Sequence, residues 1–565
     1  MMNNIHKFSN KDIKALFLFV AFMLLYLLPG IYSHTPWKQD ENYSFGIIQT
    51  MYETGNWLVP VNAGEPFMEK PPLYYWTATT FIHLLSKWLP MYDAARTATL
   101  FFSIINFSFF ILLARRAFDV QNFTNSRIWI AFALYACAPG IVRHSHDMFT
   151  DTSLITGTTI GLYGLLGLIK NEKTHYSIVW LAMGTAITML SKGVFIPGLL
   201  WICLLLAPIF LKNCRAKKYW LNIFLAGMIA LILILPWPTI LLIKHPDLFK
   251  VWFWDNNIGR FLGFSVEDLG ARAAPSRIPE AVLLFAFPAG LLAFIVIVKN
   301  PIKTLTDQRY FIFAAFILLG IILLQISASS RALYLLPVIT PMAILATGIF
   351  TKLPEKIYSA LSLCFSMLWS ILILFVWATY LLSLSSDYKH WLAPLGKWLP
   401  MSYQMYFSGF IFTSAVIITI IWIAKSRILS KSPALRTAQN WILGIAVVWG
   451  LVFTLFIGWI DYTKGYKEVF TDLKQHLAGE YKADDCMSSY FIGESEAPML
   501  YYFAHILHQR QKNFAAPQTC RWLIMLSEDI EPAPTGMTLF WSGHRPNDKN
   551  KNLVVYKKVM PEMAK

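Results

Sequence analysis

The sequence predicts a polytopic α-helical membrane protein that ends in a small α/β domain. Hydrophobic residues make up 56% of its 565 residues and charged residues only 14%, which is more apolar surface than a soluble protein could keep from water. Long apolar runs recur up to residue 461, whereas the composition changes sharply after residue 462. We therefore divide the chain into a transmembrane domain, 1–461, and a C-terminal α/β domain, 462–565.

The transmembrane domain contains about 13 segments of the length and apolarity that a membrane-spanning helix needs. The first follows three lysines but precedes no small-residue cleavage site, so we interpret it as a retained helix rather than a signal peptide. The predicted spans are 15–32, 96–114, 127–140, 152–169, 176–191, 193–211, 219–242, 279–298, 310–328, 332–350, 357–382, 405–424 and 439–461.

Residues 72–89 are apolar, but we predict that they lie in the membrane interface without crossing. The segment starts with Pro-Pro, is rich in aromatic residues and carries His83 and Lys87. With a cytoplasmic N-terminus, this choice puts clusters of Lys and Arg in cytoplasmic loops throughout the chain, as the positive-inside rule requires. The net charge of +16 is then a topology signal, and we predict no nucleic-acid partner.

The same topology assigns several segments to the other face, the periplasmic face of a bacterial inner membrane. These segments are 33–95, which we name the first outer loop, 144–151, 244–279, 327–331 and the C-terminal domain. Ionisable groups at the edge of a bilayer are costly to place and indicate a functional site. We therefore expect the chemistry of the protein on this face.

The first outer loop carries the strongest indication of such a site. Asp40 and Glu41 begin a segment, 41–54, whose apolar residues recur at helical spacing, so we predict an amphipathic helix on the membrane that stops at Gly55. Glu69 and Lys70 follow, just before Pro-Pro and an aromatic run. The loop would thus hold an acidic pair and a cation at the membrane surface.

A second acidic residue, Asp147, is predicted on the same face as Asp40. Two carboxylates from separate loops that converge at the interface suit glycosyl transfer, in which one accepts a proton from the acceptor or holds it. Asp151 is the alternative candidate. An Asp beside a helix start can also be a simple N-cap.

Several cations are predicted near helix ends on the outer face, against the positive-inside bias. These cations are Arg143, Lys192, Arg260 and Arg331. A single cation there can be a snorkelling side chain. A group of them beside an acidic loop would form a pocket for an anion, such as the phosphate of a lipid, through charge-assisted hydrogen bonds.

The C-terminal domain is predicted to contain two helices, 466–478 and 496–507, and four strands, 487–492, 521–526, 537–541 and 552–558. Cys486 and Cys520 could form a disulfide if the domain is periplasmic. No catalytic motif stands out in this domain, and a lid or docking role stays open.

Six motifs together resemble a known family. In order they are DENYSFGIIQTMYETGNWLVP, FMEKPPLYYW, RHSHDMFTD, LSKG, FWDNNIGRF and SSRALYLLP. In combination they resemble the bacterial integral-membrane glycosyltransferases related to protein O-mannosyltransferases, and they are most similar to the aminoarabinose (4-amino-4-deoxy-L-arabinose) transferases that modify lipid A. The resemblance covers the transmembrane domain. It implies a C-type glycosyltransferase (GT-C) fold and transfer of a sugar from an undecaprenyl-phosphate-linked donor on the periplasmic face.

By motif position, the resemblance implies Asp40 and Asp147 as the catalytic acids. It places Lys70, Arg260 and Tyr334 near the donor phosphate, and Glu69 where aminoarabinose transferases have a carboxylate zinc ligand. The full set of predicted substrate-binding residues is Glu41, Lys70, Tyr74, Lys192, Arg260, Arg331 and Tyr334.

The chain departs from the family pattern at two positions. Asn257 stands where a histidine zinc ligand is expected, and asparagine binds zinc poorly. Tyr43 stands where an arginine often follows the acidic pair. Neither departure affects the predicted reaction class, EC 2.4. The identity of the sugar and the presence of a bound metal stay open.

The acceptor also stays open at this stage. Lipid A or another cell-envelope glycolipid is the first expectation, and a protein O-glycosyltransferase or an oligosaccharide ligase would differ only in the acceptor. A secondary transporter would place ionisable residues near the middle of the membrane, often in repeated halves, and a scaffold would need no cluster of acids and bases. We expect a monomeric enzyme surrounded by membrane lipids.

Overall fold

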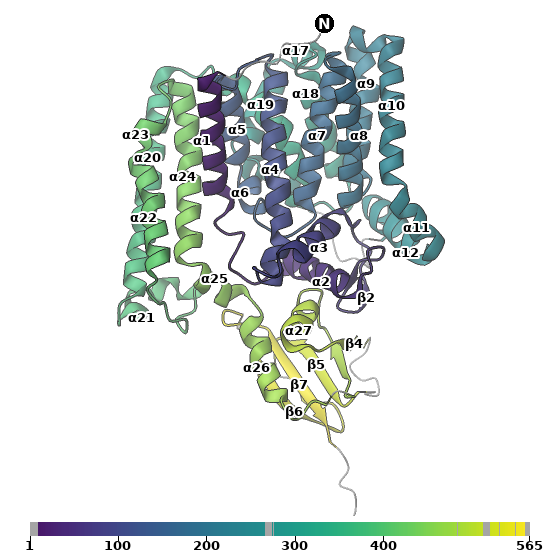
Figure 1. Cartoon of the computed structure of the whole chain (residues 1–565), viewed down its shortest axis with the longest axis vertical. Helices are drawn as coiled ribbons and strands as arrows, with labels where there is room; N and C mark the ends of the chain where they lie inside the picture. The colour runs from purple at the N-terminus through teal and green to yellow at the C-terminus, as the bar shows by residue number, and fades with distance from the viewer. Residues whose placement is uncertain are drawn as a thin grey trace, which may run out of the picture.

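The computed structural model describes residues 9–265, 274, 276–482, 484–511, 520–529, 532–548 and 550–559. A helical bundle forms most of the molecule, and the C-terminal domain projects from one end of it (Figure 1). The first half of the bundle contains α1 (Asn10–Leu27), α4 (Met91–Ala117), α5 (Ser126–Ala136), α6 (Pro139–His144), α7 (Asp151–Ile169), α8 (Thr174–Lys192), α9 (Phe195–Phe210), η1 (Lys212–Arg215), α10 (Lys217–Ile234), α11 (Pro236–Lys244) and α12 (Pro246–Lys250).

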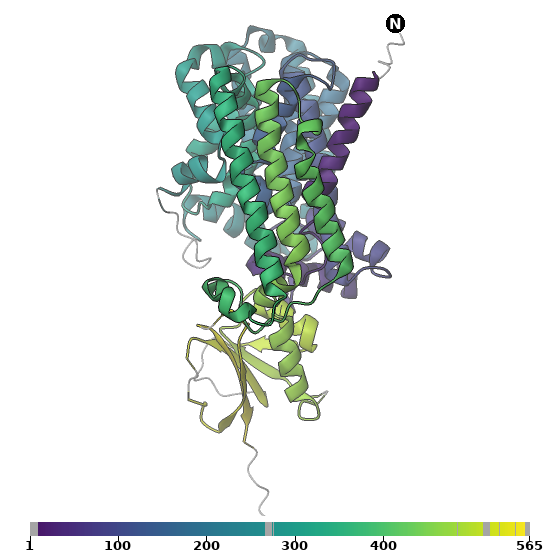
Figure 2. The same ribbon diagram turned by 90° about the vertical axis from the view of Figure 1, so that its left-hand side faces the viewer.

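The second half begins with a π-helical segment, η2 (Val251–Gly259), that runs into the short α13 (Arg260–Leu262). It continues with α15 (Arg277–Glu280), η3 (Ala281–Phe285), α16 (Ala289–Lys299), α17 (Pro301–Thr306), α18 (Phe311–Ile326), η4 (Ala332–Leu335), α19 (Leu336–Phe350), α20 (Glu355–Ser383), α21 (Tyr388–Trp391), η5 (Ala393–Lys397), α22 (Gly409–Ile423), α23 (Lys425–Ile428), α24 (Pro433–Leu455) and α25 (Ile457–Lys464). Helices α20, α22 and α24 stand side by side at one edge of the bundle (Figure 2).

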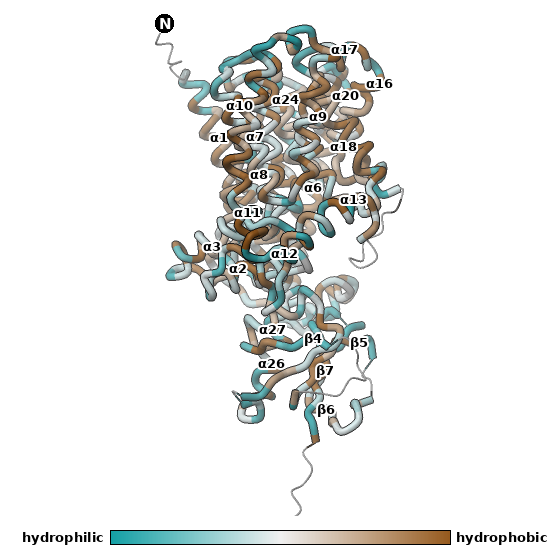
Figure 3. Tube along the Cα trace, turned by 90° about the vertical axis from the view of Figure 1, so that its right-hand side faces the viewer, coloured by the Kyte–Doolittle hydropathy of each residue, from teal (hydrophilic) through white to brown (hydrophobic). Residues whose placement is uncertain are grey.

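Every predicted span overlaps at least one helix of the bundle, but 127–140, 219–242 and 279–298 are each divided between two or more helices. Within the described ranges, six helices are long and apolar enough to cross a membrane, or seven if the bent pair 277–285 and 289–299 is one span, and four further apolar helices are shorter. Hydrophilic residues gather at the end of the bundle opposite the C-terminal domain (Figure 3). The chain thus has a multi-pass membrane domain, and the number of about 13 spans stays a prediction.

Helices α7 and α8 pack closely against each other and position two charged residues of the site. They approach so closely that a Cβ on Gly184 would lie 2.3 Å from the backbone nitrogen of Gly161, the small-residue contact common between membrane helices. Helix α7 begins at Asp151 and α8 ends at Lys192. The close contact therefore holds this acid and this base next to each other.

Two helices of the first outer loop, α2 (Lys38–Thr54) and α3 (Leu73–Leu85), lie across the end of the bundle that bears the C-terminal domain (Figure 1). Between them lies a small hairpin, β1 (Val61–Asn62) and β2 (Glu65–Pro66). Gly55 ends α2 in the left-handed conformation, with φ of 67°, as predicted. One face of α2 is covered by the C-terminal domain: Tyr501 donates a 2.6 Å hydrogen bond to Glu53, and Gly46 packs against Pro498.

The C-terminal domain packs two helices, α26 (Lys467–Leu477) and α27 (Glu496–Ala504), with a five-stranded sheet. Its strands are β3 (Met487–Tyr490), β4 (His508–Arg510), β5 (Trp522–Ser527), β6 (Met537–Gly543) and β7 (Asn552–Lys558), in the order β4-β3-β5-β7-β6. All six predicted elements are present, and only β4, a three-residue edge strand, was not predicted. Cys486 and Cys520 form a disulfide.

Candidate active site

A cavity of about 460 Å³ opens at the end of the bundle that faces the C-terminal domain. Its walls come from the first outer loop, the break between α8 and α9, the η2–α13 segment and the turn before η4. One further residue, Glu494, comes from the C-terminal domain, in the loop that precedes α27. The charged residues of the wall are Asp40, Glu69, Lys70, Lys192, Arg260, Arg331 and Glu494.

Asp40 and Lys70 are joined through the hydroxyl of Tyr43. The Tyr43 hydroxyl donates a 2.7 Å hydrogen bond to Asp40 Oδ1 and accepts a hydrogen bond from Lys70 Nζ. Burial raises the pKa of Asp40, but Lys70, the Tyr43 hydrogen bond, Lys192 and Arg331 together outweigh it and hold this pKa below its usual value. Asp40 is therefore a carboxylate, ready to accept a proton.

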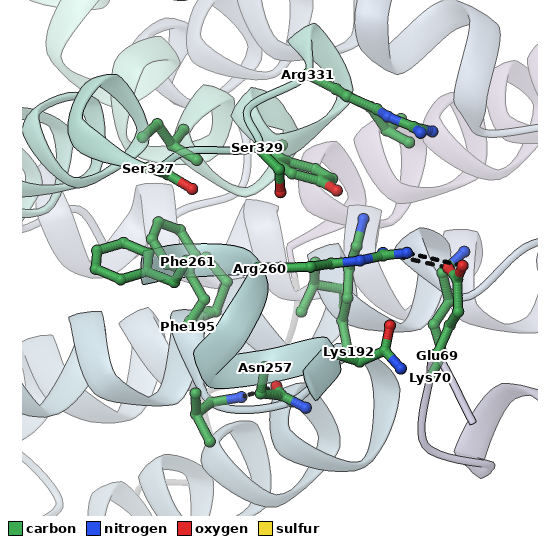
Figure 4. A pocket seen from close by; sticks show the side chains of 18 of the residues that line it. Glu69, Lys70, Lys192, Phe195, Asn257, Arg260, Phe261, Ser327, Ser329 and Arg331 are labelled. Carbon is green, nitrogen blue, oxygen red and sulfur yellow. Dashed lines mark hydrogen bonds and ion pairs between the residues drawn. The ribbon is translucent and has the colours of Figure 1, made fainter. Parts of the chain in front are cut away.

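Arg260 makes a two-pronged ion pair with Glu69. Arg260 Nη2 lies 2.8 Å from Glu69 Oε1, and Nη1 lies 3.3 Å from Glu69 Oε2. Figure 4 shows the guanidinium reaching across the cavity to Glu69 beside Lys70. The pair thus links the η2–α13 segment to the first outer loop.

Lys192 is held by a carboxylate behind the cavity wall. Its Nζ lies 2.5 Å from Oδ1 of Asp151, which is fully buried, and 4.6 Å from the centre of the aromatic ring of Tyr334. Gly193, with φ of 93°, lets the chain turn sharply after this lysine. The alternative acid of the sequence analysis, Asp151, therefore acts on the cavity through Lys192.

The opposite part of the cavity is apolar. Figure 4 shows Phe195 and Phe261 at the far end from Glu69 and Lys70. The other apolar wall residues are Leu154, Val194, Ile196, Ile258, Leu262, Leu323, Leu324, Leu333 and Pro337. One cavity thus joins a charged part to a hydrocarbon-like part.

Three predicted site residues lie outside the cavity wall. Buried Glu41 accepts hydrogen bonds from the backbone nitrogens of Trp37, at 2.8 Å, and Met148, at 2.9 Å, and pairs with Arg96 at 3.3 Å. It therefore connects the start of α2, next to Asp40, to the outer segment 144–151.

The other two are Asp147 and Tyr74. Asp147 lies 2.8 Å from His144 Nδ1, and the hydroxyl of buried Tyr74 lies 2.6 Å from the hydroxyl of Thr99. Neither side chain lines the cavity. The other acid considered in this loop, Asp151, pairs with Lys192 of the cavity wall.

The residues at the predicted zinc position do not fit a metal. Glu69 is bound to Arg260, while Asn257 accepts a hydrogen bond from Val194 N at 3.2 Å and donates one to Trp252 O at 2.8 Å. Across the residues that the structure describes, no group of three or more His, Cys, Asp or Glu side chains could hold a metal ion. Asn257 instead fixes the break between α8 and α9.

The sequence comparisons find aminoarabinose transferases among the relatives of this chain. No protein-family model matches the chain. The chain is 25% identical, over 338 residues, to undecaprenyl phosphate-alpha-4-amino-4-deoxy-L-arabinose arabinosyl transferase 1 of Pseudomonas fluorescens, a match that covers 58% of each chain. It is 23% identical over 465 residues to the transferase of Yersinia enterocolitica, covering 79% of this chain and 76% of that one. The match thus spans less than two thirds of the first of these relatives.

The structural comparison covers nearly the whole chain. ArnT from Cupriavidus metallidurans bound to undecaprenyl phosphate superposes with a TM-score of 0.68 at 13% identity, over 97% of this chain and 98% of that chain. The same protein in the apo state gives 0.65 at 14% identity, over 96% and 98%. The predicted GT-C fold, in the form seen in ArnT, is confirmed, and so is the resemblance to the aminoarabinose transferases.

Proposed function

We propose that the chain is a glycosyltransferase that moves a sugar from an undecaprenyl-phosphate-linked donor to an acceptor at the outer face of the membrane. The cavity is the observation that carries the proposal: four cations and Asp40 line a space that continues into an apolar part. A polyprenyl phosphate has the same two parts, an anionic head and a hydrocarbon tail. The names of the relatives and the fold shared with ArnT support this assignment.

In this reaction Asp40 accepts a proton, and the cations of the wall stabilise the departing phosphate. A hydroxyl of the acceptor attacks the anomeric carbon, its proton passes to Asp40, and the bond from that carbon to the phosphate oxygen breaks with its electron pair on the phosphate. Lys70, Arg260 and Arg331 stabilise the departing phosphate. Lys192 adds positive charge at the wall, held in place by Asp151. Attack on the face opposite the phosphate inverts the anomeric centre.

The sugar that fits this wall best is an amino sugar. Glu494 brings a carboxylate from the C-terminal domain into the cavity, and a protonated amine on the sugar could pair with it. The relatives are named for 4-amino-4-deoxy-L-arabinose. For the acceptor, we propose lipid A or another glycolipid of the cell envelope.

The location proposed for the enzyme is the bacterial inner membrane, with the cavity on the periplasmic side. The Lys and Arg clusters favour the cytoplasm for the opposite end of the bundle. The Cys486–Cys520 disulfide favours an oxidising compartment for the C-terminal domain.

The test is transfer by the purified protein in detergent or proteoliposomes. Undecaprenyl-phosphate-linked aminoarabinose and lipid A are supplied, and mass spectrometry measures the sugar added to lipid A. Mass spectra of lipid A, other glycans and periplasmic proteins from a deletion strain identify the acceptor by the sugar mass that disappears. Uptake of a labelled solute into proteoliposomes without any sugar transfer would instead establish a transporter.

Tyr43→Phe is expected to shift the acid limb of the pH–rate profile upward by about one unit, because one hydrogen bond to the Asp40 carboxylate is lost. That bond lowers the pKa of Asp40, so its removal raises the pKa and fewer molecules hold an ionised Asp40 at low pH. The other groups that lower this pKa, Lys70, Lys192 and Arg331, are not altered by the substitution. At high pH the rates of the variant and the wild type should converge.

Tyr75→Phe is the matched control, since it removes a buried hydroxyl from the neighbouring helix α3. Its pH–rate profile, measured in the same transfer assay, should coincide with that of the wild type. An unshifted limb in Tyr43→Phe would show that Tyr43 does not set the charge of Asp40.

A further inference from the structure

Glu69 is bound to the guanidinium of Arg260, which is a cation that the phosphate of the donor would need. The two prongs, at 2.8 Å and 3.3 Å, use both terminal nitrogens of the guanidinium. The side chains are 18% and 22% exposed, so both are shielded from bulk water yet open to the cavity. A ligand that enters the cavity can therefore reach the pair.

A guanidinium offers the same planar fork to a carboxylate and to a phosphate. Its two terminal nitrogens cannot keep Glu69 in this bidentate geometry and at the same time grip a phosphate in the same way. The other paired cations of the wall are held differently: Lys192 by Asp151, which lies behind the wall, and Lys70 by the neutral hydroxyl of Tyr43. Glu69 thus holds the fork of Arg260 directly and competes with a phosphate for it.

This competition also has an energetic basis. An arginine without an anion in a partly desolvated cavity is unfavourable, and a nearby carboxylate removes that cost. When a phosphate arrives, the carboxylate has to give up part of its bonding. The favourable energy of the Arg260–phosphate contact is reduced by the energy of the pair that it replaces.

We propose that Glu69 is a positioning residue that stands in for the lipid phosphate on Arg260. Glu69 pairs with the guanidinium in the empty site. The ion pair opens when the phosphate of the donor binds Arg260, and it forms again as undecaprenyl phosphate leaves. Glu69 thereby weakens the binding of the product and speeds its release. This inference rests on the proposed function, because it takes the ligand to be a polyprenyl phosphate.

The experiment compares Glu69→Gln with the wild type in the binding of undecaprenyl phosphate, measured by calorimetry in detergent micelles. The glutamine keeps the size of the side chain and removes its charge. We expect about tenfold tighter binding, since a charge-assisted competitor is lost. In the transfer assay, kcat and the donor KM should both fall, because product release becomes slower while capture of the donor is not impaired.

Glu65→Gln is the matched control. Glu65 lies in the same loop and also pairs with an arginine, Arg510, at 3.4 Å, but it does not line the cavity. Its affinity for undecaprenyl phosphate, its kcat and its KM should equal those of the wild type. Inorganic phosphate, titrated separately, distinguishes a general increase in anion binding from an effect on the lipid.

Three results would overturn the inference: unchanged or weaker binding of undecaprenyl phosphate by Glu69→Gln, tighter binding of inorganic phosphate alone, or a fall in kcat with a rise in KM. Thermal unfolding checks that the variant is folded. Glu69→Asp, with a shorter carboxylate, is the second variant, and its affinity should lie between those of the wild type and Glu69→Gln. A wild-type protein that neither binds undecaprenyl phosphate nor transfers sugar would refute the proposed function instead.

Discussion

Asp40→Asn is expected to lower kcat by a factor of about 10² to 10⁴, the usual contribution of a general base. Asparagine keeps the shape of the side chain and can still accept the hydrogen bond from Tyr43, but it cannot take a proton from the acceptor. Because Asp40 is held as a carboxylate by Lys70, Lys192, Arg331 and Tyr43, its charge rather than its size is what the substitution removes. The measurement is single-turnover sugar transfer at saturating donor.

Glu53→Gln is the control for this prediction. Glu53 lies on the same helix, α2, and contacts the C-terminal domain through Tyr501, away from the cavity. Its turnover should stay within about twofold of the wild type, as surface substitutions usually do. If folded Asp40→Asn transferred sugar at the wild-type rate, the proton would have another acceptor and the assigned role of Asp40 would be wrong.

The helical elements were predictable because lipid imposes a simple rule on sequence. Each span has to hide its backbone polar groups in a helix and present apolar side chains, so composition alone locates it. Residues 72–89 show where composition is insufficient: the segment is apolar, and only its prolines and the charge pattern of later loops indicated that it does not cross. In the structure its helix, α3, lies across the end of the bundle (Figure 1).

The sequence predicted most charged residues of the site, but not which of them form ion pairs with one another. Charges that violate the positive-inside bias identified Arg143, Lys192, Arg260 and Arg331, and all of these except Arg143 line the cavity, together with Lys70 of the first outer loop. The partners of these cations are set by tertiary contacts that local sequence does not encode. Glu69 was noted only for its place at the family's zinc-ligand position, and its pairing with Arg260 was not predicted.

Two further residues show the same limit. Glu494 lies in the C-terminal domain, more than 200 residues beyond Arg260, and no motif around it pointed to the cavity. Tyr43 was noticed only as a departure from the family pattern, although its helical spacing of three residues from Asp40 puts both on one face of α2. That spacing was the signal that could have identified it.

Asp151→Asn is expected to reduce kcat/KM far more than Asp147→Asn does. Asp151 is the buried partner that holds Lys192 at the cavity wall, and without it the lysine loses its position there; the loss of one member of a buried ion pair also typically costs about 3–5 kcal/mol of folding stability. Asp147 contacts His144 and does not line the cavity, so its substitution leaves the Asp151–Lys192 pair in place. The measurement is kcat/KM for both variants, with thermal unfolding to separate loss of activity from loss of stability.

A double-mutant cycle with Lys192→Met decides whether Asp151 acts through the lysine. If it does, the double variant should be less impaired than the sum of the two single effects, with a coupling energy of about 1–3 kcal/mol. The fully buried Asp151 carboxylate cannot reach a substrate in the cavity, so its whole effect should disappear once Lys192 is gone. Additive effects, or a larger loss in Asp147→Asn than in Asp151→Asn, would restore Asp147 as the second acid of the site.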